Sequence, residues 1–159
     1  MRRSMLIVLS LMAGILAASS TALCGVVINE IALNPSANDP LAAEWVEIYN
    51  PGPDNVDIGG WVVVVQAYPW SGSMEMAPGT VIPANGYKVV TGDPRWTHEI
   101  NASAILYSAS GEEIDRTPIL EDDEDEGSNW SRYPNGVDND RLTDWAYITA
   151  TKGRENVLR

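Results

Sequence analysis

The stretch Glu44-Trp45-Val46-Glu47-Ile48-Tyr49-Asn50 alternates between two kinds of position. In an extended chain Val46 and Ile48 fall on one face and Trp45, Glu47 and Tyr49 on the other, because successive side chains of a strand point to opposite faces. Pro51-Gly52-Pro53 follows directly and ends the strand, since proline has no N–H to donate to a ladder. The stretch therefore predicts a β-strand with one face toward a core.

Similar short runs recur from residue 26 to residue 149. They are rich in valine, isoleucine and aromatic residues, and clusters of Gly, Pro, Asn and Asp separate them. No stretch after residue 25 keeps apolar residues at helical spacing for three turns. About nine short strands at this spacing predict an all-β chain of the β-sandwich class. The tryptophans expected in its core are Trp45, Trp61, Trp130 and Trp145.

The composition excludes several classes of protein. The 159 residues include 22 acidic and 10 basic side chains, a net charge of −12, which argues against nucleic acid as a partner. One Cys and one His exclude a disulfide framework within the chain and zinc sites built from three or four such ligands. His98 lies in no nucleophile motif, so we expect no catalytic triad. A small secreted hydrolase that uses two carboxylates stays open, because 22 acids always offer pairs.

The N-terminal segment has the features of an export signal. Arg2 and Arg3 precede an apolar run from Met5 to Ala18, and Ser20-Thr21-Ala22 supplies small residues before a cleavage point. Residues 1–22 are therefore predicted to be a signal peptide, and residues 25–159 a single domain that is secreted or held at the cell surface. An uncleaved membrane anchor is the alternative, although the run is short against the roughly 20 apolar residues of a membrane span.

Ordered motifs cover residues 26–156 and carry a resemblance to a known family. They are Val26-Val27-Ile28-Asn29-Glu30-Ile31, Glu44-Trp45-Val46-Glu47-Ile48-Tyr49-Asn50-Pro51, Val56-Asp57-Ile58-Gly59-Gly60-Trp61, Ile82-Pro83-Ala84-Asn85-Gly86-Tyr87, Gly111-Glu112-Glu113-Ile114-Asp115, Asn129-Trp130-Ser131-Arg132-Tyr133-Pro134-Asn135-Gly136 and Thr151-Lys152-Gly153-Arg154-Glu155-Asn156. Together they resemble the lamin tail domain family, in its exported microbial form. The resemblance implies an immunoglobulin-like β-sandwich that binds or tethers, alone or beside secreted hydrolases and nucleases.

Two acidic segments are candidate calcium ligands. The run from Glu121 to Glu126 contains Asp122, Asp123 and Asp125, and a second segment has Asp138 and Asp140 at alternating positions. Calcium binds clusters of carboxylate and carbonyl oxygens, but neither segment matches the EF-hand loop. The alternatives are a solvated, self-repelling loop for the first segment and turn-stabilising side chains for the second. No other cofactor is expected.

Other candidate contact and modification sites lie outside the acidic segments. Trp70 and Trp96 fall in stretches that we expect to be loops, and both are candidates for an exposed binding surface. Asn101 and Asn129 each begin an Asn-X-Ser sequon, and Asn101 is the better acceptor because Asn129 precedes an expected core tryptophan.

These observations favour an exported, non-catalytic interaction module whose partner is a protein or a cell-envelope component. A calcium-stabilised adhesion module and a carboxylate hydrolase are the two alternatives.

Overall fold

The computed structural model describes residues 25–34, 43–96, 101–123 and 127–158. The predicted signal peptide, with its two outcomes of cleavage or anchoring, lies outside these residues. Within them, no helix is long and apolar enough to cross a membrane.

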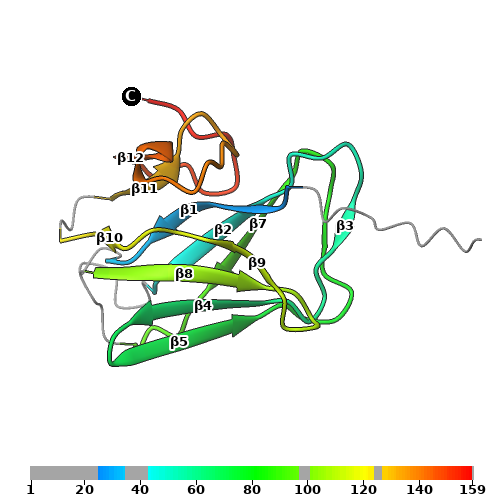
Figure 1. Cartoon of the computed structure of the whole chain (residues 1–159), viewed down its shortest axis with the longest axis horizontal. Helices are drawn as coiled ribbons and strands as arrows, with labels where there is room; N and C mark the ends of the chain where they lie inside the picture. Colours follow the sequence, from blue (N-terminus) through cyan, green and yellow to red (C-terminus); the bar gives the residue numbers. More distant parts are fainter. Residues whose placement is uncertain (1–24, 35–42, 97–100, 124–126, 159) are drawn as a thin grey trace, which may run out of the picture.

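Two antiparallel sheets face each other and form a sandwich (Figure 1). The first sheet has the order β12-β11-β1-β2-β7, with β1 at Val27–Ala32, β2 at Trp45–Tyr49, β7 at Tyr87–Thr91, β11 at Ser128–Arg132 and β12 at Trp145–Thr149. The second has the order β10-β8-β4-β5, with β4 at Val62–Ala67, β5 at Trp70–Glu75, β8 at Asn101–Tyr107 and β10 at Leu120–Glu121, while β9 at Glu113–Arg116 also pairs with β8. The expected β-sandwich of immunoglobulin-like type is confirmed.

Two smaller elements complete the fold. Strands β3 (Val56–Asp57) and β6 (Val81–Ile82) form a two-stranded sheet, and a single 3-10 turn covers Leu142–Asp144. The described residues therefore contain twelve strands rather than about nine. Strands β5 and β10 are the elements that the sequence did not predict.

The register between β1 and β2 determines what enters the core. Ile28 pairs with Ile48 and Ile31 pairs with Val46, so all four side chains share one face and are fully buried between the sheets. Ile28 and Ile31 are three residues apart, and simple alternation would place them on opposite faces. A β-bulge between Ile28 and Glu30 adds the extra residue that restores the alternation. It also places Glu30 opposite Glu47 on the other face of the sheet.

Three of the four tryptophans expected in the core are buried: Trp45, Trp61 and Trp145. The fourth, Trp130, is half-buried, and its ring contacts the ring of Tyr147 edge-on with 5.5 Å between their centroids. The aromatic volume that phenylalanine supplies in many cores is therefore provided largely by tryptophan, because the sequence contains no Phe.

Candidate binding groove

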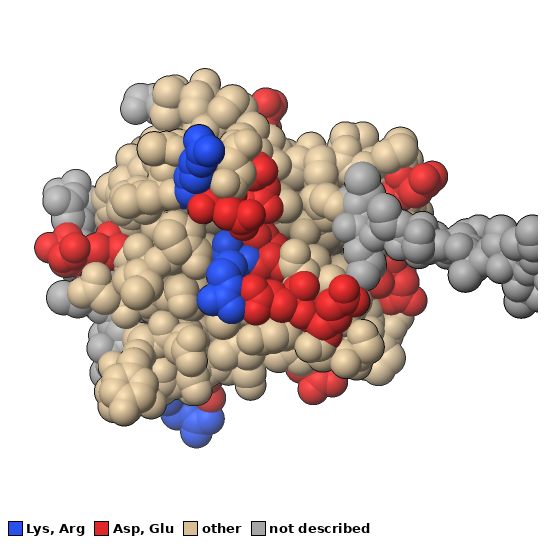
Figure 2. Space-filling view, in the orientation of Figure 1, with Lys and Arg blue, Asp and Glu red and all other residues tan. Residues whose placement is uncertain are grey.

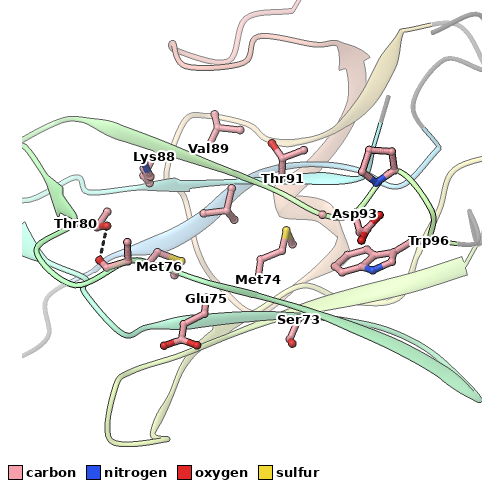
Figure 3. A pocket seen from close by; sticks show the side chains of 14 residues that line it. Ser73, Met74, Glu75, Met76, Thr80, Lys88, Val89, Thr91, Asp93 and Trp96 are labelled. Carbon is pink, nitrogen blue, oxygen red and sulfur yellow. Dashed lines mark hydrogen bonds between the residues drawn. The ribbon is translucent and has the colours of Figure 1, made fainter. Parts of the chain in front are cut away.

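A hollow lies at the open side of the sandwich. There the edge strand of the first sheet, β7, faces the edge strand of the second sheet, β5. They enclose a groove of about 770 Å³ (Figure 3). It is lined by residues of both strands, by the residues after β5 and by the turn after β7. This volume is within the range of about 300 to 1,000 Å³ that is usual for ligand sites.

Two methionines form the apolar floor of this groove. Met74 belongs to β5 and Met76 follows it; they are 6% and 2% exposed, and Figure 3 shows Met74 pointing toward β7. Ser73 and Glu75, the alternate residues of β5, also border the groove, but Figure 3 shows their side chains on the opposite side of the strand from that of Met74. Methionine side chains are flexible and polarizable, so a floor of this kind adapts to apolar groups of different shape.

Trp96 closes one end of the groove by packing against backbone. A Cβ atom placed on Gly72 would lie 2.7 Å from its ring, and one placed on Gly92 would lie closer still. Gly72 belongs to β5 and Gly92 follows β7, so the indole rests on both sheet edges at once because neither residue has a side chain. The ring of Trp70 meets it edge-on at 5.2 Å between centroids.

A short turn holds Trp96 in this position. The Trp96 N–H donates to the carbonyl of Asp93 at 2.9 Å, and the Arg95 N–H donates to the Asp93 carboxylate at 2.9 Å. The Arg95 guanidinium also donates to this carboxylate, and these hydrogen bonds lower the pKa of Asp93 to about 2. Asp93 is thus ionised, and its charge is balanced by Arg95.

Lys88 is the cation of the groove. It lies in the middle of β7 and lines the hollow. Among the described residues no carboxylate forms an ion pair with its ammonium group, whereas Arg95, Arg116 and Arg132 are each paired with an acid. The groove therefore combines a floor of two buried methionines with a cation that has no ion-paired carboxylate among the described residues.

The predicted contact residues Trp70 and Trp96 come together, and one of them lines the groove. The expectation of a loop at Trp70 is wrong, because this residue begins β5 and is half-buried. Trp96 is also half-buried, and both rings pack against the core. The part of Trp96 that a ligand can contact is therefore the exposed edge of its ring, because the rest of the indole is packed against the protein.

Two of the acidic residues predicted as calcium ligands, Asp122 and Asp138, have protein partners in the structure. Asp122 is buried, and its carboxylate accepts from the N–H groups of Leu33 and Asn34 at 3.1 Å and from the Tyr147 hydroxyl at 2.9 Å. Burial raises the pKa of Asp122, and the hydrogen bond from Tyr147 opposes the rise. Asp122 therefore fastens the segment after β1 rather than projecting into solvent with Asp123, which is exposed.

Asp138 and Asp140 lie in one turn, where the Asp138 carboxylate contacts the Asp140 backbone and a buried arginine. The Asp138 carboxylate accepts from Arg132 at 2.8 Å and from the Asp140 N–H at 3.2 Å. Asp125 lies outside the described residues, and within them no three His, Cys, Asp or Glu side chains are grouped as a metal site would require. The calcium ligands thus stay a prediction without support from the geometry.

The two sequons differ sharply in exposure. Asn101 begins β8 and is exposed, so its acceptor role stays a prediction. Asn129 is 0% exposed, and its amide donates to the Glu30 carboxylate at 2.9 Å. A glycan on Asn129 is incompatible with this fold, since the modified nitrogen lies in the interior.

Several residues of the sequence motifs meet on the outer face of the first sheet. There the carboxylate of Glu30 accepts from the N–H and the hydroxyl of Thr151, at 2.6 and 3.0 Å. Asn156 donates to the carbonyls of Asn29 and Arg132 at 3.0 and 2.9 Å. We call residues 151–156 the C-terminal latch, because these contacts fasten them over β1 and β11.

Glu47 completes the attachment of the C-terminal latch. Its carboxylate accepts from the Asn29 amide at 3.0 Å and from the Gly153 N–H at 2.5 Å. Burial raises the pKa of Glu47 to about 7, which the two hydrogen bonds oppose. Glu30 and Glu47 are opposite each other, and both are 0% exposed, so this carboxylate pair holds the fold together and no substrate reaches it.

Sequence reasoning missed Met74, Met76 and Lys88, which define the groove. The alternation of Trp70, Gly72, Met74 and Met76 is the signal that would have indicated β5, but serine and glycine at residues 71–73 made the stretch resemble a loop. Lys88 lies in one of the short β-rich runs between residues 26 and 149, yet the sequence did not indicate that this strand would be a sheet edge.

Comparison with known proteins gives one family. The family model described as Lamin Tail Domain matches residues 19–119, which include β1 to β9. No curated protein matches the chain. Strands β11 and β12 and the C-terminal latch follow the matched range, and they complete the first sheet and its outer face.

Proposed function

Because the chain belongs to the Lamin Tail Domain family and presents a groove between two sheet edges, we propose that it is an exported, non-catalytic interaction module. Its partner is a protein or a cell-envelope component that binds in this groove. The single observation that carries the proposal is the groove itself: buried Met74 and Met76 form its floor, Trp96 closes one end, and Lys88 lines it without an acid partner among the described residues.

The side chains around the groove support binding more than chemistry. Its lining contains neither Cys nor His, and Asp93 is ionised and paired with Arg95. The hydroxyl of Thr80 donates to the carbonyl of Ala77 at 2.6 Å (Figure 3). A nucleophile with an adjacent base, which group-transfer chemistry needs, is not assembled among these residues.

The charge of the surface favours a protein partner. Figure 2 shows acidic side chains gathered in a band across the middle of one face, with basic side chains set into the band. A net charge of −12 attracts partners that carry positive charge, and it raises their rate of encounter at low ionic strength. We therefore expect the whole partner to be basic, even though Lys88 requires a local acid within the groove.

The proposal is tested by capture of partners from an extract of the producing cell's envelope on the immobilised chain. Lys88 pairs with Ile48, which points into the core, so the Lys88 side chain is on the groove side of β7, and Lys88→Glu reverses the charge that the groove presents. The matched control is Tyr68→Glu, since Tyr68 is 97% exposed and does not line the groove. Capture that Lys88→Glu abolishes and Tyr68→Glu preserves supports the proposal. Equal capture by both variants contradicts it.

A further inference from the structure

We propose that the groove binds an extended segment of the partner protein as an additional strand on β7, with an acidic side chain opposite Lys88 and an apolar side chain opposite Val90. This inference rests on the proposed function and specifies how the partner is recognised. Strand addition to an open sheet edge is an established mode of peptide recognition, in which main-chain hydrogen bonds give affinity and alternate side chains give specificity.

The backbone of β7 has a free side. The Asn50 N–H donates to the Gly86 carbonyl at 3.0 Å, and the Gly92 N–H donates to the Glu44 carbonyl at 2.8 Å. These two hydrogen bonds lie at the two ends of the ladder between β2 and β7. Because bonded pairs alternate along an antiparallel ladder, the backbone groups of Lys88 and Val90 also face β2. The N–H and carbonyl groups of the residues between them therefore face away, toward the open edge. These residues are Tyr87, Val89 and Thr91.

The side chains opposite an incoming strand are determined by the same register. Lys88 pairs with Ile48 and Val90 pairs with Val46, and both partners point into the core. Lys88 and Val90 therefore share the inner face of β7 and point toward the groove. Residues directly opposite each other on paired strands share a face, so the two recognised side chains of the incoming segment are separated by one residue.

The charge of Lys88 indicates which segment fits. Its ammonium lines the groove and has no acid partner among the described residues. A carboxylate on the incoming strand would supply this partner in a site partly shielded from water. The apolar residue on the same face would then meet Val90 and the methionine floor, which includes Met74.

A second copy of this chain is a poorer occupant of the edge. Two copies would each bring a net charge of −12, and pairing two β7 strands would bring two Lys88 side chains to one interface. Inward-pointing lysines on edge strands are a recognised device against such self-association. The charge pattern therefore favours a different chain.

The edge of β5 is less suitable than that of β7. A strand added there would place a side chain opposite Gly72, where the ring of Trp96 already lies 2.7 Å from the position of a Cβ atom. On β7 the Trp96 ring covers only the end at Gly92, and the stretch from Lys88 to Val90 stays open.

The test uses a synthetic capped peptide in which a leucine and a glutamate are separated by one threonine and flanked by threonines. It is titrated into the purified, isotope-labelled chain, and amide shifts and hydrogen exchange are followed by NMR. We expect the amides of Tyr87, Val89 and Thr91 to become protected, and those of Ser73 and Glu75 to stay unprotected. Shifts without protection on β7, protection on β5 instead, or no shifts at all would overturn the strand-addition mode.

Two variants separate strand pairing from simple occupancy of the groove. Val89→Pro removes an N–H that faces the peptide and leaves the bonds to β2 intact, so peptide binding should be lost. Ser73→Pro is the matched change on β5, because the Ser73 N–H also faces an open sheet edge. Peptide binding should persist in this variant. If both proline variants bind the peptide alike and Lys88→Glu still blocks partner capture, the proposed function stands and strand addition is wrong.

A charge exchange tests the same mode without a proline. Lys88→Glu should abolish binding of the glutamate peptide, and a peptide with lysine in place of glutamate should bind the Lys88→Glu chain. Because this exchange restores an interaction, it does not depend on whether Val89→Pro folds. Failure of the exchanged pair to bind, with a folded chain, would contradict the assigned contact.

Discussion

The guanidinium of Arg132 donates to both carboxylate oxygens of Asp115, at 3.0 Å each, and so joins the first sheet to the second. Both side chains are almost completely buried, with exposures of 1% and 2%. The Ile28 N–H also donates to Asp115 at 2.6 Å, and Arg132 lies 4.8 Å from the ring centroid of Trp145. The pair is thus a buried ionic connection between β9 and β11, with further hydrogen bonds on each side.

Replacing Asp115 with alanine should destabilise the chain by about 3 to 5 kcal/mol, because it leaves a buried guanidinium without its carboxylate. Urea unfolding measures this change in the free energy of unfolding. The matched control is Asp138→Ala, which removes the half-exposed acid that contacts the same arginine at 2.8 Å. A control variant as unstable as Asp115→Ala would show that the two acids share the charge of Arg132 equally.

Glu47 should make the chain less stable as the pH rises toward neutrality. Burial raises the pKa of Glu47 from 4.5 to about 7, so the folded chain holds this proton more tightly than the unfolded chain does. The free energy of unfolding is then highest below pH 4.5 and falls as the pH rises through about 7. The contribution of this one group is about 3 kcal/mol.

The measurement is the urea midpoint as a function of pH for the parent chain and for Glu47→Gln, whose side chain does not titrate. Between about pH 4.5 and about pH 7, the urea midpoint of the parent chain should fall more steeply than that of Glu47→Gln. A residual slope is expected in the variant, because burial also raises the pKa of Asp115 to about 6. Glu112→Gln, an exposed control, should leave the profile unchanged. A Glu47→Gln profile that follows the parent would disprove the assignment.

Local patterns predicted the strands but not which of them form edges. Val46 and Ile48 alternate with polar and aromatic residues, and this local pattern is sufficient to predict both the strand and its buried face. Strand β5 was missed because Ser71 and Gly72 are typical of turns, and only pairing with β4 makes this stretch a strand. Tertiary pairing therefore overrides the local preference.

The candidate site depends on contacts between distant segments, which residue type and spacing do not reveal. Trp96 was predicted to be a contact residue, but its position depends on Gly72 and Gly92 on two different sheets. Asp138 has the spacing of a calcium ligand, yet the fold brings Arg132 to it. Nothing in the local sequence distinguishes an acid that will meet an arginine from one that will meet a metal.

Asn156→Ala should release the C-terminal latch and cost about 1 to 3 kcal/mol for each buried polar group that loses its partner. The amide of Asn156 satisfies the carbonyls of Asn29 and Arg132, and its oxygen accepts from Thr151 at 2.6 Å. Hydrogen exchange should show faster exchange at Thr151 and Gly153 than in the parent chain. Arg154→Ala is the control, since Arg154 is exposed in the same segment. Equal stability of the two variants would contradict a fastening role for Asn156.

Gly92→Ala should displace Trp96 from the end of the groove. All three atoms nearest to a Cβ on Gly92 belong to the Trp96 ring, so the added methyl group forces this ring to move. Overpacking of this kind typically costs about 1 to 3 kcal/mol, and a change in tryptophan fluorescence should accompany it. The decisive measurement is a double-mutant cycle, because Gly92→Ala should have little effect once Trp96→Ala has removed the ring. If the cost persists in the double variant, the backbone conformation at residue 92, and not the neighbouring indole, is what requires glycine.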